Sequence, residues 1–101
     1  MGTFQIRNTL NGKIYIGSSP DLIAIWHAQK LQLDMGIHQN SNLQKEWDES
    51  GSENFAYEIL EEIEQTDESA DYKKEIKILE EIWLDRIKPY GDKGYHNLPS
   101  L

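Results

Sequence analysis

Residues 4–17 read FQIRNTLNGKIYIG, and this stretch decides the fold. Residues 4–7 alternate apolar and polar side chains, which is typical of a strand with one buried face. Residues 13–17 form a second run rich in β-forming side chains. Asn11 and Gly12 lie between the two runs, and both tolerate the positive φ values of a tight turn. The stretch therefore predicts an antiparallel hairpin that turns within residues 8–12.

A helix is predicted directly after this hairpin. Ser19 is a suitable N-cap residue, with Pro20 at the first helical position. Gly36 is a suitable stop, because glycine readily adopts the left-handed conformation that ends many helices. The side chains that recur on one face of this helix are Leu22, Ile25, Trp26, Gln29 and Leu33.

The middle of the chain predicts a short second helix and a third strand. Ser41 or Asn42 can cap the helix, and Gly51 ends it. Residues 55–60, FAYEIL, are typical of a strand. Together with the hairpin, this strand predicts a small three-stranded antiparallel sheet flanked by helices, which is an α+β fold.

The C-terminal third predicts a long helix after an acidic segment. Residues 62–70 are polar and acidic, and they suit a loop or a ragged helix start. Apolar residues then recur at helical spacing until Pro89 ends the pattern. These residues are Tyr72, Ile76, Leu79, Trp83 and Ile87. Residues 90–101 are rich in glycine and proline and are predicted to be irregular.

Length and composition indicate one globular domain over residues 1–101. The chain has no cysteine, so disulfides and thiolate metal sites are excluded. It contains no apolar run long enough to span a bilayer and no secretion signal, so we expect no membrane association and a cytoplasmic location.

The formal net charge of −8 is unusual for a nucleic-acid-binding protein, since such proteins generally carry basic surfaces. The acid is concentrated in the second half of the chain. One interpretation is a solvated face, and the other is a surface that avoids DNA or binds a basic partner. The residues concerned are Glu58, Glu61, Glu62, Glu64, Asp67, Glu68 and Asp71.

Several short motifs resemble the GIY-YIG nuclease family in the same order along nearly the whole chain. Residues 15–17, Tyr-Ile-Gly, match the second motif that names the family, and residues 2–4, Gly-Thr-Phe, are a degenerate form of the first. Further matches are GIH at 36–38, NLQ at 42–44, GSENF at 51–55, ILE at 59–61, PYG at 89–91 and GYHN at 94–97. The resemblance implies a GIY-YIG-like fold, and such single-domain members occur in phages and bacteria.

The family resemblance also implies a site for metal-dependent phosphodiester hydrolysis. Glu80 matches the glutamate that holds the metal ion, and Tyr15 matches the tyrosine of the second motif. Phe4 stands in place of the first motif's tyrosine and lacks its hydroxyl group. His38 matches a family histidine, and Asn97 lies close to the family's terminal asparagine, with His96 as an additional residue beside it.

Two positions on the first helix depart from the family pattern. The resemblance places the catalytic arginine at Ile25 and a histidine, in many members, at Gln29. An aliphatic side chain cannot stabilise the negative charge of the phosphate in the transition state. Arg7 or Lys13 could replace the missing cation, and the sequence does not decide between these alternatives.

Two functions remain compatible with these residues. The first is a catalytically inactive GIY-YIG-like domain that binds a basic or nucleic-acid-associated protein and binds DNA weakly or not at all. The second is a weak metal-dependent DNA endonuclease with a relocated cation. We expect either no cofactor or weakly bound Mg²⁺ at Glu80.

Overall fold

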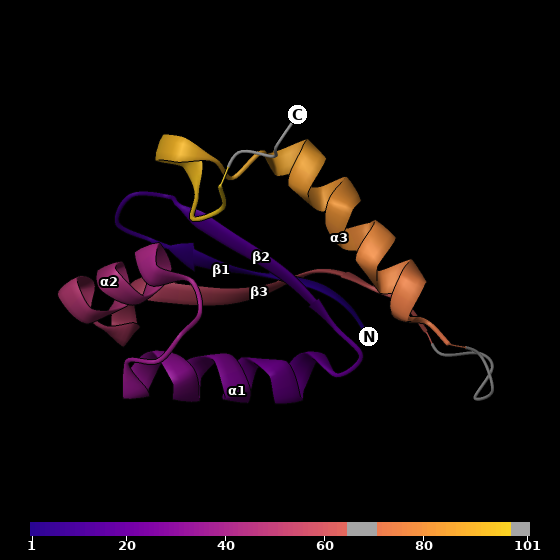
Figure 1. The fold of residues 1–101 in the computed structure, drawn as a ribbon, viewed down its shortest axis with the longest axis horizontal. Coiled ribbons are helices and arrows are strands. Elements are labelled where there is room, and N and C mark those ends of the chain that lie inside the picture. The colour runs from indigo at the N-terminus through magenta and orange to yellow at the C-terminus, as the bar shows by residue number, and fades with distance from the viewer. Residues whose placement is uncertain (65–70, 98–101) are drawn as a thin grey trace.

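The structure, a computed structural model, describes residues 1–64 and 71–97 (Figure 1). Two strands are followed by two helices, a third strand and a third helix, which confirms the predicted order. None of the described helices is long and apolar enough to cross a membrane. The elements are β1 (Gly2–Asn8), β2 (Ile14–Ser19), α1 (Leu22–Met35), α2 (Ser41–Ser50), β3 (Phe55–Glu62) and α3 (Lys73–Ile87), with short 3-10 helices at Ser52–Asn54 and Gly91–Lys93.

The three strands form one antiparallel sheet in the order β2-β1-β3. Ile6 of β1 lies opposite Tyr15 of β2 and opposite Tyr57 of β3. In the hairpin turn, the Gly12 N–H donates to the Asn8 carbonyl at 2.7 Å. Gly12 has a φ of 79°, a conformation that glycine adopts without strain. The predicted hairpin and the α+β class are therefore confirmed.

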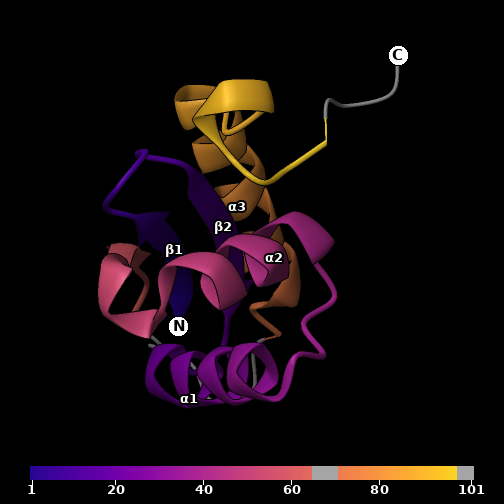
Figure 2. The same cartoon turned by 90° about the vertical axis from the view of Figure 1, so that its left-hand side faces the viewer.

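Helices cover both sides of the sheet, with α1 and α2 on one side and α3 on the other (Figures 1 and 2). The side chains of β1 alternate between these two sides. Phe4 and Ile6 belong to a hydrophobic cluster shared with α1 and α2, whereas Ile76 is buried on α3. The buried members of the cluster are Phe4, Ile6, Tyr15, Leu22, Leu33, Leu43, Trp47 and Tyr95.

Both predicted helix caps are wrong by one or two residues. The Asp21 carboxylate caps α1 by accepting from the Ile23 and Ala24 N–H groups at 3.1 and 2.9 Å. The Ser19 hydroxyl accepts from the Asp21 N–H instead, so it stabilises the turn that precedes the helix. Helix α2 is capped by Asn40, one residue before the predicted Ser41. Both capping side chains belong to good N-cap types, so composition alone did not select between neighbouring candidates.

The segment after α3 is more ordered than predicted, because it lies along the open edge of β2. The Tyr95 N–H donates to the Ile14 carbonyl at 3.1 Å. The Ile16 N–H donates to Nε2 of His96 at 2.8 Å. This pairing joins residues about eighty positions apart, which local sequence patterns do not reveal. The acidic segment begins one residue later than predicted, since β3 extends to Glu62. The prediction of a loop or a ragged helix start over residues 65–70 falls outside the described residues.

Candidate functional site

Strand β2 holds the Tyr15 side chain among polar and aromatic groups. Its ring stacks on the His96 ring with centroids 5.1 Å apart and meets the His38 ring edge-on at 5.4 Å. Burial raises the pKa of the Tyr15 phenol, the Gln39 side chain acts in the opposite direction, and the Glu80 charge raises it further. The phenol is therefore protonated at neutral pH.

Helix α3 brings Glu80 to the region of Tyr15, where its charge acts on the phenol. The Ser18 hydroxyl donates to Oε1 of Glu80 at 3.2 Å. No three His, Asp or Glu side chains gather as a metal-binding group within residues 1–64 and 71–97. One carboxylate beside a hydroxyl still suits a hard cation such as Mg²⁺, which keeps most of its water ligands. A bound ion would supply Lewis-acid activation of a phosphate.

Gln29 of α1 and His38 of the following loop form a buried pair. Nδ1 of His38 accepts from the Asn40 backbone N–H at 3.0 Å, so the proton lies on Nε2. That Nε2–H donates to Oε1 of Gln29. Burial lowers the pKa of His38, and the imidazole is consequently neutral at pH 7. It does not supply the positive charge that phosphate stabilisation requires.

His96 completes this group from the C-terminal segment. Nε2 of His96 accepts a hydrogen bond from the Ile16 N–H, and burial lowers the pKa of the imidazole. His96 is therefore also neutral at pH 7. We refer to Tyr15, Gln29, His38, Glu80 and His96 together as the Tyr15 site.

Phe4 packs in the hydrophobic core beside the Tyr15 site. It is 1% exposed, and its ring centroid lies 5.4 Å from that of Tyr57. Its Cζ atom, where tyrosine carries the hydroxyl, lies directly over Gly17. A Cβ atom on Gly17 would stand 2.5 Å from that carbon, so only glycine leaves room for the ring.

Ile25 lies one turn before Gln29 on α1. Its side chain is partly buried and packs against the hydrophobic cluster together with Trp26, which stacks on Tyr57 at 4.8 Å. This part of α1 therefore contributes apolar packing and no charge.

The two cations of the hairpin are each paired with a carboxylate. Nε of Arg7 lies 2.7 Å from Oε1 of Glu58. Nζ of Lys13 lies 3.1 Å from Oε2 of Glu46. The charge of each cation is therefore already balanced by a carboxylate.

This fold and residue arrangement match a known nuclease domain. The chain is 32% identical to the catalytic domain of homing endonuclease I-TevI, with a TM-score of 0.79 and 98% of each chain covered. A mutant of the catalytic domain of intron endonuclease I-TevI matches with 32% identity, a TM-score of 0.78, and coverage of 94% of this chain and 90% of that one. The chain belongs to the GIY-YIG nuclease family.

A curated relative is intron-associated endonuclease 1 of Enterobacteria phage T4, which is 34% identical over 87 residues. That match covers 85% of this chain but 32% of the relative, so the chain spans about a third of the relative's length. No protein-family model matches the chain.

The GIY-YIG motif residues separate into two groups in space. Tyr15, Gln29, His38 and Glu80 come together in the Tyr15 site, whereas Phe4 and Ile25 pack into or against the core. Asn97 is exposed. By the family pattern, His96 is an additional residue, and the Gly-Tyr-His-Asn run at 94–97 is the only sequence signal that includes it. In the structure the His96 ring stacks on Tyr15. The catalytic roles assigned by the GIY-YIG resemblance remain predictions.

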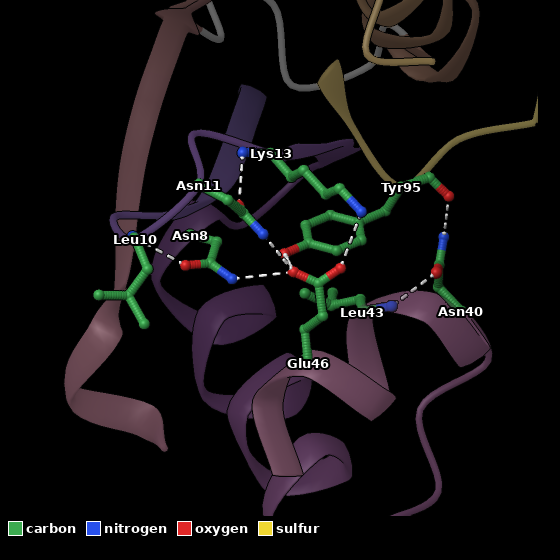
Figure 3. Close-up of polar contacts among 8 residues, drawn as sticks. All are labelled: Asn8, Leu10, Asn11, Lys13, Asn40, Leu43, Glu46 and Tyr95. Carbon is green, nitrogen blue, oxygen red and sulfur yellow. Dashed lines mark hydrogen bonds and ion pairs between the residues drawn. The ribbon is translucent and has the colours of Figure 1, made fainter. Parts of the chain in front are cut away.

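A second polar centre, which the sequence did not predict, surrounds Glu46 on α2 (Figure 3). Oε1 of Glu46 accepts from the Asn8 amide at 3.0 Å, the Asn11 amide at 2.6 Å and the Tyr95 hydroxyl at 3.0 Å. Oε2 of Glu46 forms the ion pair with Lys13. Through these contacts, Glu46 connects the hairpin turn, α2 and the C-terminal segment. Glu46 also lines a polar hollow of about 430 Å³. No local sequence pattern signals a centre built from three distant segments.

The acidic residues proposed from the sequence as a partner-binding face do not form one uniform surface. Glu58 accepts from Arg7 and from the Gln5 amide, and Glu61 accepts from the Trp83 indole N–H at 3.0 Å. The Asp71 carboxylate accepts from a backbone N–H at the start of α3. Glu62 and Glu64 are exposed, and Asp67 and Glu68 lie outside the described residues. Their role in binding a partner remains a prediction.

Proposed function

We propose that this GIY-YIG domain does not cleave DNA and instead binds a protein partner. The main support for this proposal comes from Ile25. This residue packs against the core at the position where the family resemblance places the catalytic arginine. Losing one such charge-stabilising group typically costs about a hundredfold or more in rate. Arg7 and Lys13 are already paired with Glu58 and Glu46, so neither compensates.

The charge distribution supports the same proposal. Helix α1 contains a single cation, Lys30, and the whole chain has a net charge of −8. Affinity for DNA depends largely on Lys and Arg side chains that neutralise phosphates and release counterions. A partner with a basic surface, including a nucleic-acid-associated protein, suits this chain better than DNA does.

The competing function is a weak metal-dependent DNA endonuclease. It is favoured by Glu80 and Tyr15, which keep the family's metal ligand and phenol in one region. Because Glu80 is the only carboxylate in the Tyr15 site, we expect Mg²⁺ to bind weakly there. Calorimetry should detect no micromolar binding, and tight binding that Glu80→Gln abolishes would favour the enzyme.

A plasmid-nicking assay tests the proposal directly. The protein is incubated with supercoiled plasmid at low salt with Mg²⁺ or Mn²⁺, and we expect no nicking. The Glu80→Ala variant controls for contaminating nuclease. Robust nicking by the unmodified protein that disappears in Glu80→Ala would overturn the proposal and identify an active endonuclease.

A further inference from the structure

Strand β3 forms an open edge of the sheet. The strand order β2-β1-β3 places β1 on one side of β3, and no strand within the described residues pairs with its other side. The opposite edge, on β2, differs because the C-terminal segment lies along it, with a bridge between Ile14 and Gly94. An open edge presents unpaired backbone N–H and C=O groups, and another strand can extend it.

The backbone groups of β3 point alternately toward β1 and toward the open edge. At the start of the ladder, the Thr9 N–H donates to the Asn54 carbonyl at 2.8 Å. Because the direction alternates along an antiparallel strand, the amide of Glu58 points toward β1. The amides of Tyr57 and Ile59 therefore point outward, where another strand can bond to them.

The helices leave this edge at the margin of both layers. Helices α1 and α3 pack mainly on β1 and β2. Ile59 is consequently 48% exposed, although Phe4, directly opposite on β1, is 1% exposed. A strand added beside β3 would cover the Ile59 side chain and remove its apolar surface from water.

Two glutamates of β3 share the side of the sheet that faces α3. Glu58 pairs with Arg7, whose side chain lies on the face of β1 opposite the hydrophobic cluster. Glu61 accepts from the Trp83 indole N–H of α3. The register shift between them keeps both glutamates on this side although they are three residues apart. An added strand would therefore place alternate side chains beside these glutamates and the others beside Ile59.

The charges of β3 indicate what kind of strand fits. Residues 55–64 contain four glutamates and no lysine or arginine. Within residues 1–64 and 71–97, Glu61 and Glu62 have no cationic partner. Two copies of this chain paired along β3 would bring glutamates together without any cation, and like charges on neighbouring strands are destabilising. A strand that alternates basic and apolar residues matches both sides of this edge.

We propose that β3 binds an extended segment of a basic partner protein as a fourth strand of the sheet. The segment carries Lys or Arg beside Glu58 and Glu61 and apolar residues beside Ile59, and its backbone bonds to the outward amides. This inference rests on the proposed function, because it specifies how the protein partner is bound. Strand β3 contributes no residue to the Tyr15 site, so this binding can be tested separately from nuclease activity.

Three blocked synthetic peptides of about ten residues, the length of a long strand, test the proposal. The basic peptide alternates lysine with valine, and the acidic peptide alternates glutamate with valine. The third peptide is the basic one with every interior backbone amide methylated, which keeps the charge and removes the hydrogen-bond donors. Fluorescence anisotropy measures binding of each labelled peptide to the full chain. We expect the basic peptide to bind at least about tenfold more tightly than the other two.

Hydrogen exchange measured by NMR locates the bound peptide. In the free chain, the amides of Tyr57 and Ile59 should exchange faster than the amide of Glu58, which bonds to β1. A saturating concentration of the basic peptide should slow exchange at Tyr57 and Ile59 at least about tenfold, with a smaller effect at Glu58.

Matched variants test the charge and the backbone separately. Glu61→Lys should raise the Kd of the basic peptide at least about fivefold, whereas Glu81→Lys, the same change at an exposed position of α3, should not. Ile59→Pro removes an outward amide and should also weaken binding, since proline is tolerated where a strand faces solvent. Its melting temperature shows whether the fold is retained, and Glu61→Lys tests the proposal independently of that variant.

Several results would overturn the inference. The basic peptide fails to bind, or the methylated peptide binds equally well, or Tyr57 and Ile59 keep their exchange rates at saturation, or Glu61→Lys and Glu81→Lys weaken binding equally. Self-association that Ile59→Pro abolishes would identify a second copy as the occupant instead. Absence of peptide binding together with absence of nicking would reject this inference and leave the proposed function intact. Nicking that Glu80→Ala removes would overturn the proposed function whether or not the peptide binds.

Discussion

Phe4 and Ile25 retain the packing of a GIY-YIG domain without the polar groups that its chemistry needs. The Phe4 ring lies over Gly17, and Ile25 packs against the cluster that Phe4 belongs to. Packing depends on volume and apolar surface, which phenylalanine and isoleucine supply. Catalysis depends on a hydroxyl and a cation, which they lack.

Restoring these two groups should therefore restore activity, and only together. Groups that act as a unit in catalysis are strongly non-additive, so Phe4→Tyr or Ile25→Arg alone should have little effect. In a nicking assay with Mg²⁺, the double variant should exceed either single variant. Addition of Glu80→Ala should abolish the recovered activity. A double variant no better than the singles would show that another group is also missing.

Glu46 is the residue on which we expect stability to depend most clearly. Burial disfavours its charge, but the hydrogen bonds from Asn11, Lys13 and Tyr95 outweigh this and lower its pKa. Glu46→Ala leaves these donors and the Asn8 amide without their acceptor. Each unsatisfied buried group costs about 1–3 kcal/mol, so we expect a total loss of about 2–4 kcal/mol in urea unfolding. Glu49→Ala, at an exposed position of the same helix, should change stability by less than about 0.5 kcal/mol.

At the scale of elements, β2 is attached to the C-terminal segment through a titratable side chain. The Ile16 N–H donates to Nε2 of His96, and protonation of that nitrogen would remove the acceptor. The neutral imidazole is thus part of the fold. The same holds for His38, whose Nδ1 accepts from the Asn40 N–H.

Stability should consequently fall as the pH decreases below neutrality. Burial lowers the pKa of both His38 and His96, so the unfolded chain binds protons first. Their contribution is complete above the unfolded pKa of about 6.5 and is lost as the pH falls from there toward the folded pKa. Urea unfolding at pH 7.5 and 5.5 measures the loss, which should be smaller in His96→Gln. NMR titration of either imidazole at or above pH 6.5 would contradict this account.

The whole molecule carries 18 acidic against 10 basic side chains. Such an excess destabilises the folded state through self-repulsion, which salt screens. Exposed Glu62 and Glu64 lie close together at the end of β3 and beyond it. Repulsion between acidic side chains should therefore act across the whole chain, and we expect it to be strongest near the end of β3.

We expect the melting temperature to rise between 10 and 200 mM NaCl. An increase of about 0.5 kcal/mol in the free energy of unfolding raises the melting temperature by roughly 2–4 °C for a chain of this length. The double change Glu62→Lys and Glu64→Lys should raise the melting temperature at low salt and reduce its salt dependence. A melting temperature that decreases with salt would indicate that net attraction dominates the surface charges.

The sequence by itself determined the elements and their order. Alternation in residues 4–7, the Asn11-Gly12 turn and the helical spacing of Leu22, Gln29 and Leu33 are local patterns, and each appears in the structure. Family motifs also pointed to Tyr15 and Glu80. These signals were sufficient because periodicity and turn chemistry act between near neighbours in the chain.

Tertiary structure alone decided which polar groups meet. It paired Arg7 with Glu58, gathered four donors around Glu46 and placed His96 on Tyr15. Each of these outcomes depends on contacts between segments far apart in sequence, and only the folded chain brings such segments within the few ångströms over which hydrogen bonds and ring contacts act.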